Sequence, residues 1–184
     1  MTDRRYHHGD LRRALLTAAV EAIGESGPGG LGLRDLARRV GVSHAAPVHH
    51  FRDKAGLLTA LAAEGFELLA RSLAETRDRG GDFIDQGVAY VEFAVSHKAH
   101  FEVMFRPDLH HADDPDLTAA RERAGALLAD GVTDEEDPRV AAVAAWSLVH
   151  GFATLWNTGA LSREHDEDPA AVGRRVAAFL FRRS

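Results

Sequence analysis

The fold of this chain is decided between residues 33 and 54, which read Leu33-Arg-Asp-Leu-Ala-Arg-Arg-Val-Gly41-Val-Ser-His-Ala-Ala-Pro47-Val-His-His-Phe51-Arg-Asp-Lys54. Apolar residues recur at helical spacing through the first part, so they share one face of a short helix. Gly41 follows and favours the left-handed conformation that ends many helices. Ser43 is a good N-cap for a second helix. The stretch therefore predicts two short helices around a tight turn.

The second of these helices has little apolar surface to bury. Only Val48 and Phe51 are expected to face inward. Pro47 would occupy the fourth helical position, where it removes one backbone hydrogen bond and distorts the first turn. In a helix-turn-helix, the N-terminal residues of the second helix contact base edges in the major groove of DNA. The pattern favours such a DNA-reading helix over an ordinary helical hairpin with no partner. The residues left outside are His44, Ala45, Ala46, His49 and His50.

Residues 11–61 resemble the DNA-binding domain of the tetracycline-repressor (TetR) family of regulators. The matching segments are Leu33-Arg-Asp-Leu-Ala37, Gly41-Val-Ser43, His50-Phe51 and Lys54 followed by Leu57-Leu58. Three further segments resemble one branch of the family. They are Tyr6-His-His-Gly-Asp-Leu-Arg12, Ser43-His-Ala-Ala-Pro47 and, in the C-terminal domain, Trp146-Ser-Leu-Val-His150-Gly151. Together these segments extend the resemblance over most of the chain.

Two positions depart from the family pattern. Val48 stands where the family usually has a tyrosine that contacts a phosphate. Gly32 stands where the first helix of the motif is usually capped by threonine or serine, and glycine caps only weakly. Both departures suggest fewer contacts with the DNA backbone and a lower non-specific affinity than a typical member has.

Length and composition agree with a small regulator. The chain has 184 residues and no cysteine, so it has no disulfide framework and no thiolate metal site. No apolar run approaches the roughly 18 residues that span a membrane, and the polar, basic N-terminus lacks the apolar segment of a secretory signal. Apolar residues do not alternate over strand lengths. We therefore expect a cytoplasmic, all-α protein that contacts no membrane.

The distribution of charge removes an objection to DNA binding. The formal net charge is −6, which would be unusual for a protein that is basic throughout. Residues 1–60, however, contain nine Lys or Arg against six Asp or Glu, so they carry a net +3 and the remainder carries −9. A basic head on an acidic body suits local binding to phosphates.

The chain divides into two predicted domains. Residues 1–55 form a three-helix DNA-binding domain, and residues 56–184 form a helical domain that binds an effector and dimerises. Asp10 would cap the first helix and Asp53 the fourth, and Gly80-Gly81 is the main break in the pattern. The loop Gly27-Pro-Gly-Gly30 would end the first helix. The later helical segments are expected at about 83–95, 101–105, 117–128, 140–160 and 169–182.

The last two helices are the candidate dimer surface. The first of them is apolar nearly all round, from Val140 to Leu155, and a helix without a polar face is usually buried on two sides. Val172, Val176, Phe179 and Leu180 form a stripe on the last helix. The resemblance implies a two-fold dimer with a four-helix interface; a helix buried wholly within its own chain is the alternative. A dimer would place two recognition helices about one DNA turn apart, on a palindromic operator.

The resemblance also implies a small-molecule pocket in the body. We expect it to combine aromatic bulk with a few polar groups, as ligand sites do, although the same side chains would also suit a plain core. The candidates are Phe93, His97, Phe101, Met104, Phe105, Trp146 and His150. No cofactor is implied. The 11 histidines raise the question of a metal site, but no ligand pattern at helical spacing appears, and the His/Asp loop 110–114 reads as a solvated turn.

The sequence is compatible with three functions. The first is a ligand-responsive DNA-binding regulator, most simply a repressor. Arg34 and Lys54 would anchor phosphates, Ser43 would add a neutral contact, and Arg4-Arg-Tyr-His-His8 would form a basic arm along the duplex. The second is a metal-dependent hydrolase, which the lack of a nucleophile–base motif or ligand triad disfavours, so we expect no enzyme. The third is a helical adaptor that has lost specific DNA binding, which the departures at Val48 and Gly32 keep open.

Overall fold

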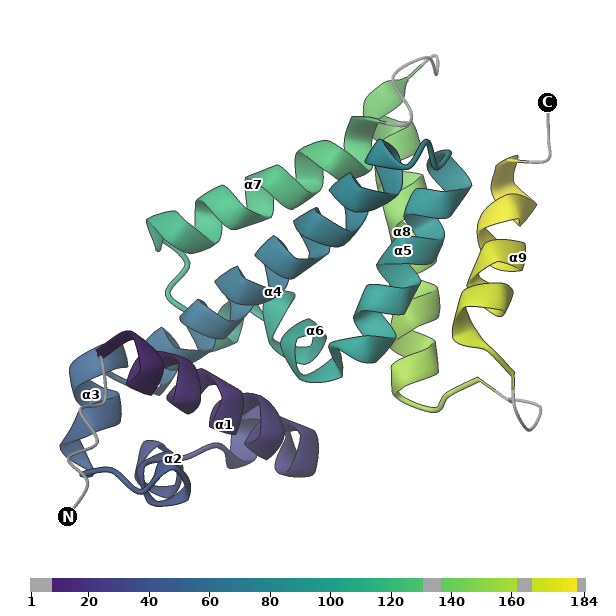
Figure 1. Cartoon of the computed structure of the whole chain (residues 1–184). Coiled ribbons are helices and arrows are strands. Elements are labelled where there is room, and N and C mark those ends of the chain that lie inside the picture. Colours follow the sequence, from purple (N-terminus) through teal and green to yellow (C-terminus); the bar gives the residue numbers. More distant parts are fainter. Residues whose placement is uncertain (1–7, 131–136, 162–166, 182–184) are drawn as a thin grey trace. The chain divides into compact units, whose positions relative to one another are not determined.

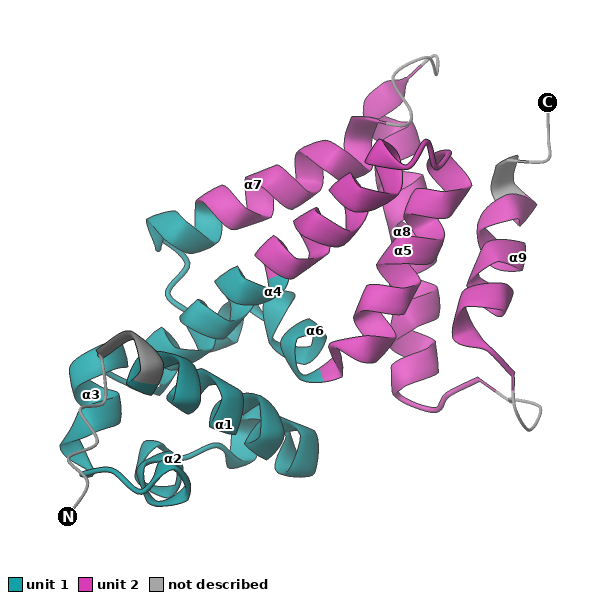
Figure 2. Ribbon diagram, in the orientation of Figure 1, with its two compact units in different colours: residues 1–65, 99–118 teal, residues 66–98, 119–184 magenta. Residues whose placement is uncertain are grey.

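The computed structural model describes residues 8–130, 137–161 and 167–181, and within these ranges every regular element is a helix (Figure 1). The all-helical prediction is therefore confirmed. The proposed basic arm at residues 4–7 lies outside the described residues, as does the side chain of His8. The chain forms two compact units, residues 1–65 with 99–118 and residues 66–98 with 119–184 (Figure 2).

The first unit contains the predicted DNA-binding helices. They pack on one apolar core, whose fully buried members include Leu15, Leu36, Leu57 and Leu61. Gly65 lets α6 approach α4 closely, because a Cβ there would lie 2.6 Å from the sulfur of Met104. The elements are α1 (His8–Gly30), α2 (Leu33–Val40), α3 (Ala45–Phe51), the first part of α4 (Lys54–Asp78), most of α6 (Lys98–Met104), the 3-10 turn η1 (Pro107–Leu109) and the start of α7 (Pro115–Ala129).

Both ends of α1 differ from expectation. The helix begins at His8, so Asp10 lies inside it and not at its N-cap. At the other end, Gly27 takes φ 71° and kinks the chain, and the helix then continues to Gly30 where an irregular loop was predicted. The reason is local: a glycine adopts positive φ at little cost, and Pro28 is preorganised for a new first turn.

The second unit is built around α5 (Phe83–Ser96), which lies beside α8 (Pro138–Asn157) and α9 (Pro169–Phe181) (Figure 1). Asp82 and Asp85 start α5 with a capping box, in which each side chain accepts the other's backbone N–H at 2.9 Å. Gly173 lets α9 approach α5, since a Cβ there would lie 3.2 Å from Val91. The remaining parts of α4 and α7 complete this unit.

Candidate DNA-binding surface and ligand cavity

The turn between α2 and α3 has the geometry that the sequence predicts. Gly41 takes φ 74°, in the left-handed region. Its N–H donates to the carbonyl of Arg38 at 3.2 Å, and the N–H of Val42 donates to the carbonyl of Ala37 at 2.9 Å. These two bonds form a Schellman motif, which satisfies carbonyls at the end of α2. At the other end of α2, Gly32 makes no side-chain cap, as its residue type dictates.

The start of α3 corrects the prediction for Ser43 and Pro47. The helix begins at Ala45, with His44 at the N-cap position in place of Ser43. Pro47 is therefore the third helical residue, not the fourth. The first four N–H groups of a helix have no partner within it, so proline removes no hydrogen bond at this position. The expected loss of a hydrogen bond at Pro47 therefore does not occur, whereas the expected short first helical turn stays a prediction.

The same register corrects the inward face of α3. Pro47 and Phe51, four residues apart, are buried, whereas the Val48 side chain is 49% exposed. The prediction that Val48 packs inward is therefore wrong. The guanidinium of Arg12 on α1 lies 5.4 Å from the ring centre of Phe51 and covers that ring. Val48 thus belongs with the outward residues, and its position four residues after His44 was the signal that would have shown it.

The predicted DNA contacts lie on the accessible side of α2, α3 and the start of α4. The exposed members are Arg34, Ser43, His44, Ala45 and His49. The half-buried members are Ala46, His50 and Lys54. With Val48 added, we call these nine residues the α3 surface. Their assignment to DNA contact stays a prediction.

The cations around the α3 surface differ in their partners. Arg39 forms ion pairs with Glu25 at 2.7 Å and Asp35 at 3.0 Å, and Arg38 also pairs with Asp35. The hydrogen bond from Arg39 lowers the pKa of Glu25. The ammonium of Lys54 donates to the carbonyl of Gly29 at 2.9 Å, and this contact holds the end of α1 against the start of α4. An ammonium has three donors, so Lys54 keeps the capacity to bind a phosphate as well.

A tight turn at Arg52 connects α3 to α4. Arg52 takes φ 67°, and the N–H of Asp53 donates to the carbonyl of Phe51 at 2.8 Å, which makes a γ-turn with a positive central φ. Asp53 then caps α4 as predicted, because its carboxylate accepts the N–H of Gly56 at 2.7 Å. That hydrogen bond and a second one from His111 at 3.2 Å lower the pKa of Asp53.

The seven predicted pocket residues form three contact groups. Phe93 in α5 and His97 at the C-cap of that helix stack, with ring centres 5.0 Å apart. Phe101 and Phe105 make an edge-to-face pair at 5.4 Å, and Met104 beside them packs on Gly65. The third group is Trp146 and His150 on α8, with ring centres 5.3 Å apart.

Tyr90 joins the third group and was not predicted. It is fully buried, and its hydroxyl lies 2.8 Å from Nδ1 of His150 and accepts the indole N–H of Trp146 at 3.3 Å. A hydroxyl can donate one hydrogen bond while it accepts another, so the Tyr90 hydroxyl can donate to Nδ1 of a neutral His150 while it accepts the indole N–H. Burial lowers the pKa of His150 and raises the pKa of Tyr90, so both groups are held neutral. A tyrosine inside the apolar run of α5 was the only signal in the sequence.

The neutral state of His150 predicts how stability depends on pH. Its pKa is lowered in the folded protein, while the unfolded chain keeps the ordinary value near 6.5. Below about pH 6.5 the unfolded state binds more protons, so the free energy of unfolding falls as the pH drops. We expect His150→Gln to lose less stability than the parent between about pH 7.5 and 5.5. Thermal melts across that range test this, and equal losses in both proteins would contradict it.

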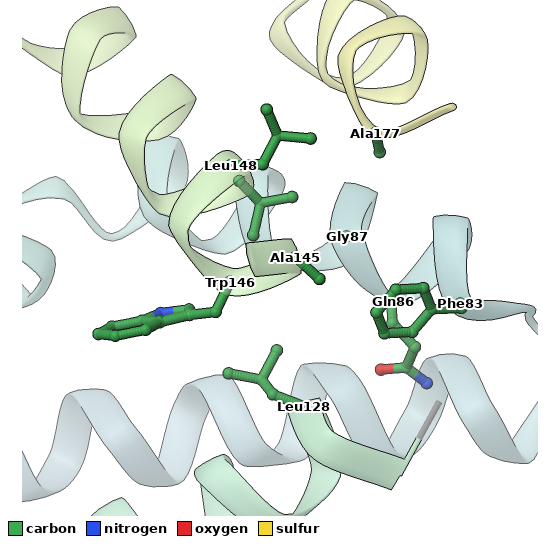
Figure 3. Close-up of a pocket in the computed structure, with 9 residues that line it drawn as sticks. Phe83, Gln86, Gly87, Leu128, Ala145, Trp146, Leu148 and Ala177 are labelled. Carbon is green, nitrogen blue, oxygen red and sulfur yellow. The ribbon is translucent and has the colours of Figure 1, made fainter. Parts of the chain in front are cut away.

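The second unit contains a cavity formed by α5, α7, α8 and α9 (Figure 3). It is small and partly open to solvent. Trp146 is the predicted pocket residue found in its wall, and the sequence pattern did not single out the others. The wall residues are Phe83, Gln86, Gly87, Leu128, Ala145, Trp146, Leu148, Val149 and Ala177.

The histidine-rich loop takes part in hydrogen bonds of the first unit. Nε2 of His110 lies 2.7 Å from the carbonyl of Val103, and the backbone N–H of His111 donates to Thr59 at 2.9 Å. In the part of the chain that the structure describes, no three His, Cys, Asp or Glu side chains are grouped so as to hold a metal ion.

One helix of the described ranges, α8, is long and apolar enough to cross a membrane by length and composition alone. A core helix of a soluble protein passes the same test. In this structure α8 packs against α5 and α9, and Ala145, Val149 and Phe152 are buried along it.

Comparison with known proteins gives matches to both halves. Residues 15–61 match the family described as bacterial regulatory proteins, tetR family, and residues 83–180 match the tetracyclin repressor-like C-terminal domain. The HTH-type transcriptional regulator BetI of Escherichia coli O139:H28 is 49% identical over 49 residues. That segment is 27% of this chain and only 25% of BetI.

Two solved structures extend the match to the whole fold. A protein of unknown function from Rhodococcus sp. RHA1 is 32% identical, covers 98% of both chains and has a TM-score of 0.81. A transcriptional regulator from Saccharomonospora viridis, solved in complex with choline, is 20% identical with a TM-score of 0.68. It covers 95% of this chain and 97% of its own. At that identity the second likeness shows the fold alone.

Proposed function

The chain belongs to the TetR family of bacterial regulatory proteins, a non-enzymatic class, and from this premise we propose that it represses transcription as a homodimer on a palindromic operator. A small-molecule effector in the second unit releases it from DNA. The observation that carries the proposal is the α3 surface: a short helix, anchored by Pro47 and Phe51, presents its polar side to solvent. Such a regulator acts in the cytoplasm, where its DNA is.

Each part of the α3 surface has a proposed role. His44 and His49 read base edges, because they are exposed on the N-terminal part and outer side of α3. Val48 contacts a thymine methyl group, the apolar feature of the major groove. Arg34 and Lys54 bind phosphates on either side and fix the register of the helix on the duplex.

The homodimer rests on the outer face of α8. Opposite its buried side, this helix exposes Val140 and Val143 by 61% and 55%, and Phe179 of α9 is 77% exposed. The rest of the face is small or apolar: Ala144, Ser147, Gly151, Thr154 and Leu155. Small residues permit two helices to approach closely, and apolar surface gains from burial. When the same face of a second subunit packs against it, the outer faces of both α8 helices are buried.

The effector acts by its difference in affinity for two conformations. The structurally similar Saccharomonospora viridis regulator binds choline, which supports small-molecule binding in this fold. In the present chain, the effector binds more tightly to a conformation whose recognition helices are wrongly spaced for DNA. The ratio of its affinities for the two conformations limits how far it can lower the affinity for DNA. Aromatic groups of the second unit, Trp146 and His150 among them, remain the proposed contacts.

The salt dependence of DNA binding tests the proposed phosphate contacts. Logarithmic affinity for duplex DNA is expected to fall linearly with the logarithm of salt concentration. Arg34→Ala removes one proposed contact from each subunit of the dimer, so it should weaken binding to all sequences and reduce the slope by about 2. Fluorescence anisotropy with a mixed duplex pool measures both. An unchanged slope would remove Arg34 from the interface.

A helical adaptor without specific DNA binding is the second candidate. Two observations favour it: Gly32 provides no side-chain cap for α2, and Val48 cannot donate a hydrogen bond to phosphate. The adaptor is expected to form a stable dimer whose binding to DNA has no sequence preference.

A further inference from the structure

We infer that the cavity between α5, α7, α8 and α9 binds a small, uncharged, largely apolar molecule that donates one hydrogen bond to Oε1 of Gln86. The inference rests on the proposed function for its regulatory meaning, because it names the class of effector. The binding chemistry itself follows from the cavity.

Gln86 supplies the polar end of the site. Its side chain is 8% exposed, and Nε2 donates to the carbonyl of Leu73 on α4 at 3.2 Å. That bond fixes the amide, since the reverse orientation would place two acceptors together. Oε1 has no hydrogen-bond partner within the described residues. Figure 3 shows this oxygen turned toward the side on which Leu128 and Trp146 lie.

An unpartnered buried carbonyl is rare in a folded protein. Nearly all buried polar atoms have a partner, and leaving an acceptor unsatisfied is unfavourable. Oε1 accepts but cannot donate, so the complementary ligand group is a hydroxyl or an N–H. Gln86 is the one polar side chain among the nine wall residues, apart from the indole N–H of Trp146. A ligand with a single hydrogen-bond donor therefore satisfies the acceptor in the wall.

The rest of the wall decides the charge and size of the ligand. No wall residue is ionisable, and a charged ligand would lose its hydration without a counter-charge. Trp146 offers ring surface only, because its indole N–H donates to Tyr90. Phe83, Leu128 and Val149 add further apolar surface. The cavity encloses little space and is partly open to solvent, so its occupant is a small molecule.

The position of the cavity connects it to regulation. Trp146 and Val149 lie on α8, whose outer face is the proposed dimer surface. Leu128 lies near the end of α7, a helix whose first residues belong to the first unit. A ligand between these helices therefore touches both elements whose movement would alter the spacing of the recognition helices.

Phenol and toluene test the inference directly, because they match in size and differ in the donor. With the full chain, phenol is expected to raise the melting temperature and to bind at least about tenfold more tightly than toluene. Benzoate, which is charged, is expected not to bind. In Trp156→Phe, the remaining Trp146 should report phenol binding through its fluorescence.

Gln86→Met removes the acceptor at similar length. We expect this variant to bind toluene at least as well as phenol, and to melt no lower than the parent without ligand. Asn157→Met is the matched control. Asn157 donates to the carbonyl of Ala94 at 2.8 Å, also from a side chain to a helix carbonyl, but it does not line the cavity. This variant is expected to keep the preference for phenol.

Three results would overturn the inference: equal binding of phenol and toluene by the parent, no binding of either, or a phenol preference that survives in Gln86→Met. If Gln86→Met does not fold, Leu128→Trp replaces it, because filling the cavity is expected to abolish phenol binding. These readouts need no DNA. If the protein binds no operator, the proposed function is contradicted but the inference about the cavity is not. If the protein is released from its operator by a molecule whose binding does not depend on Gln86, the inference about the cavity is contradicted but the proposed function is not.

Discussion

Gly151→Arg is expected to convert the homodimer to a monomer and to weaken operator binding by about 100- to 10,000-fold. Gly151 lies on the outer face of α8, and a Cβ built on it meets no atom within 4 Å of its own chain. The arginine therefore fits the isolated subunit, but it places bulk and charge where two copies of α8 would meet. The loss of affinity follows because a monomer engages one half-site at a time.

Size-exclusion chromatography with light scattering measures the first effect, and operator titration measures the second. Gly125→Arg on α7 is the matched control, since a Cβ at Gly125 also meets nothing within 4 Å. It should remain a dimer with parental DNA affinity. A dimeric Gly151→Arg protein would show that the interface lies elsewhere.

Replacing both His44 and His49 by alanine is expected to remove most of the preference for operator over unrelated DNA. Each lost base contact costs about 1–3 kcal/mol of discrimination, or roughly 5- to 150-fold. Both side chains are exposed, and the buried contacts of α3 are made by Pro47 and Phe51, so the fold should be retained. Binding to non-specific duplex should change little near pH 7.5.

Arg34→Ala provides the contrast for the histidine pair. A phosphate contact carries no sequence information, so its loss weakens operator and non-specific binding alike. Competition titrations with operator and random duplex separate the two patterns. If the variant that lacks His44 and His49 keeps its full preference for the operator, other residues contact the base edges, and Val48 is the first candidate.

Local sequence signals predicted some of the turns and caps and missed others. The turn at Gly41 and the cap at Asp53 each depend on residues within four positions along the chain, and both formed as expected. The approximate helix boundaries of the second unit and the all-helical fold class were also predictable, because they too depend on residues close together along the chain.

The register of α3 shows where a local signal misleads. Ser43 and His44 are adjacent, and either position can start a short helix. Starting at Ala45 gives Pro47 a position that needs no N–H, and the packing of the helix places Pro47 on the buried side with Phe51. This choice depends on packing against α1 and α2, which a periodicity argument does not include, and it turned Val48 outward.

The cavity was beyond prediction for a different reason. Its wall comes from four helices between Phe83 and Ala177, and their sequence periodicity shows an apolar face without showing which faces meet. Trp146 and His150, one helical turn apart in the sequence, are in contact, while their role in binding an effector stays a prediction. Their partner Tyr90 and the buried acceptor of Gln86 lie on α5, more than 50 residues away, where only tertiary packing brings them into contact.

Selection of binding sites from a random duplex library by the purified protein tests the claim that this chain is a sequence-specific DNA-binding regulator. We expect enrichment of one palindrome whose half-sites lie about one helical turn apart, with affinity for the selected sites falling steeply as the salt concentration rises. A folded, dimeric protein that enriches no sequence would contradict the claim and favour the helical adaptor.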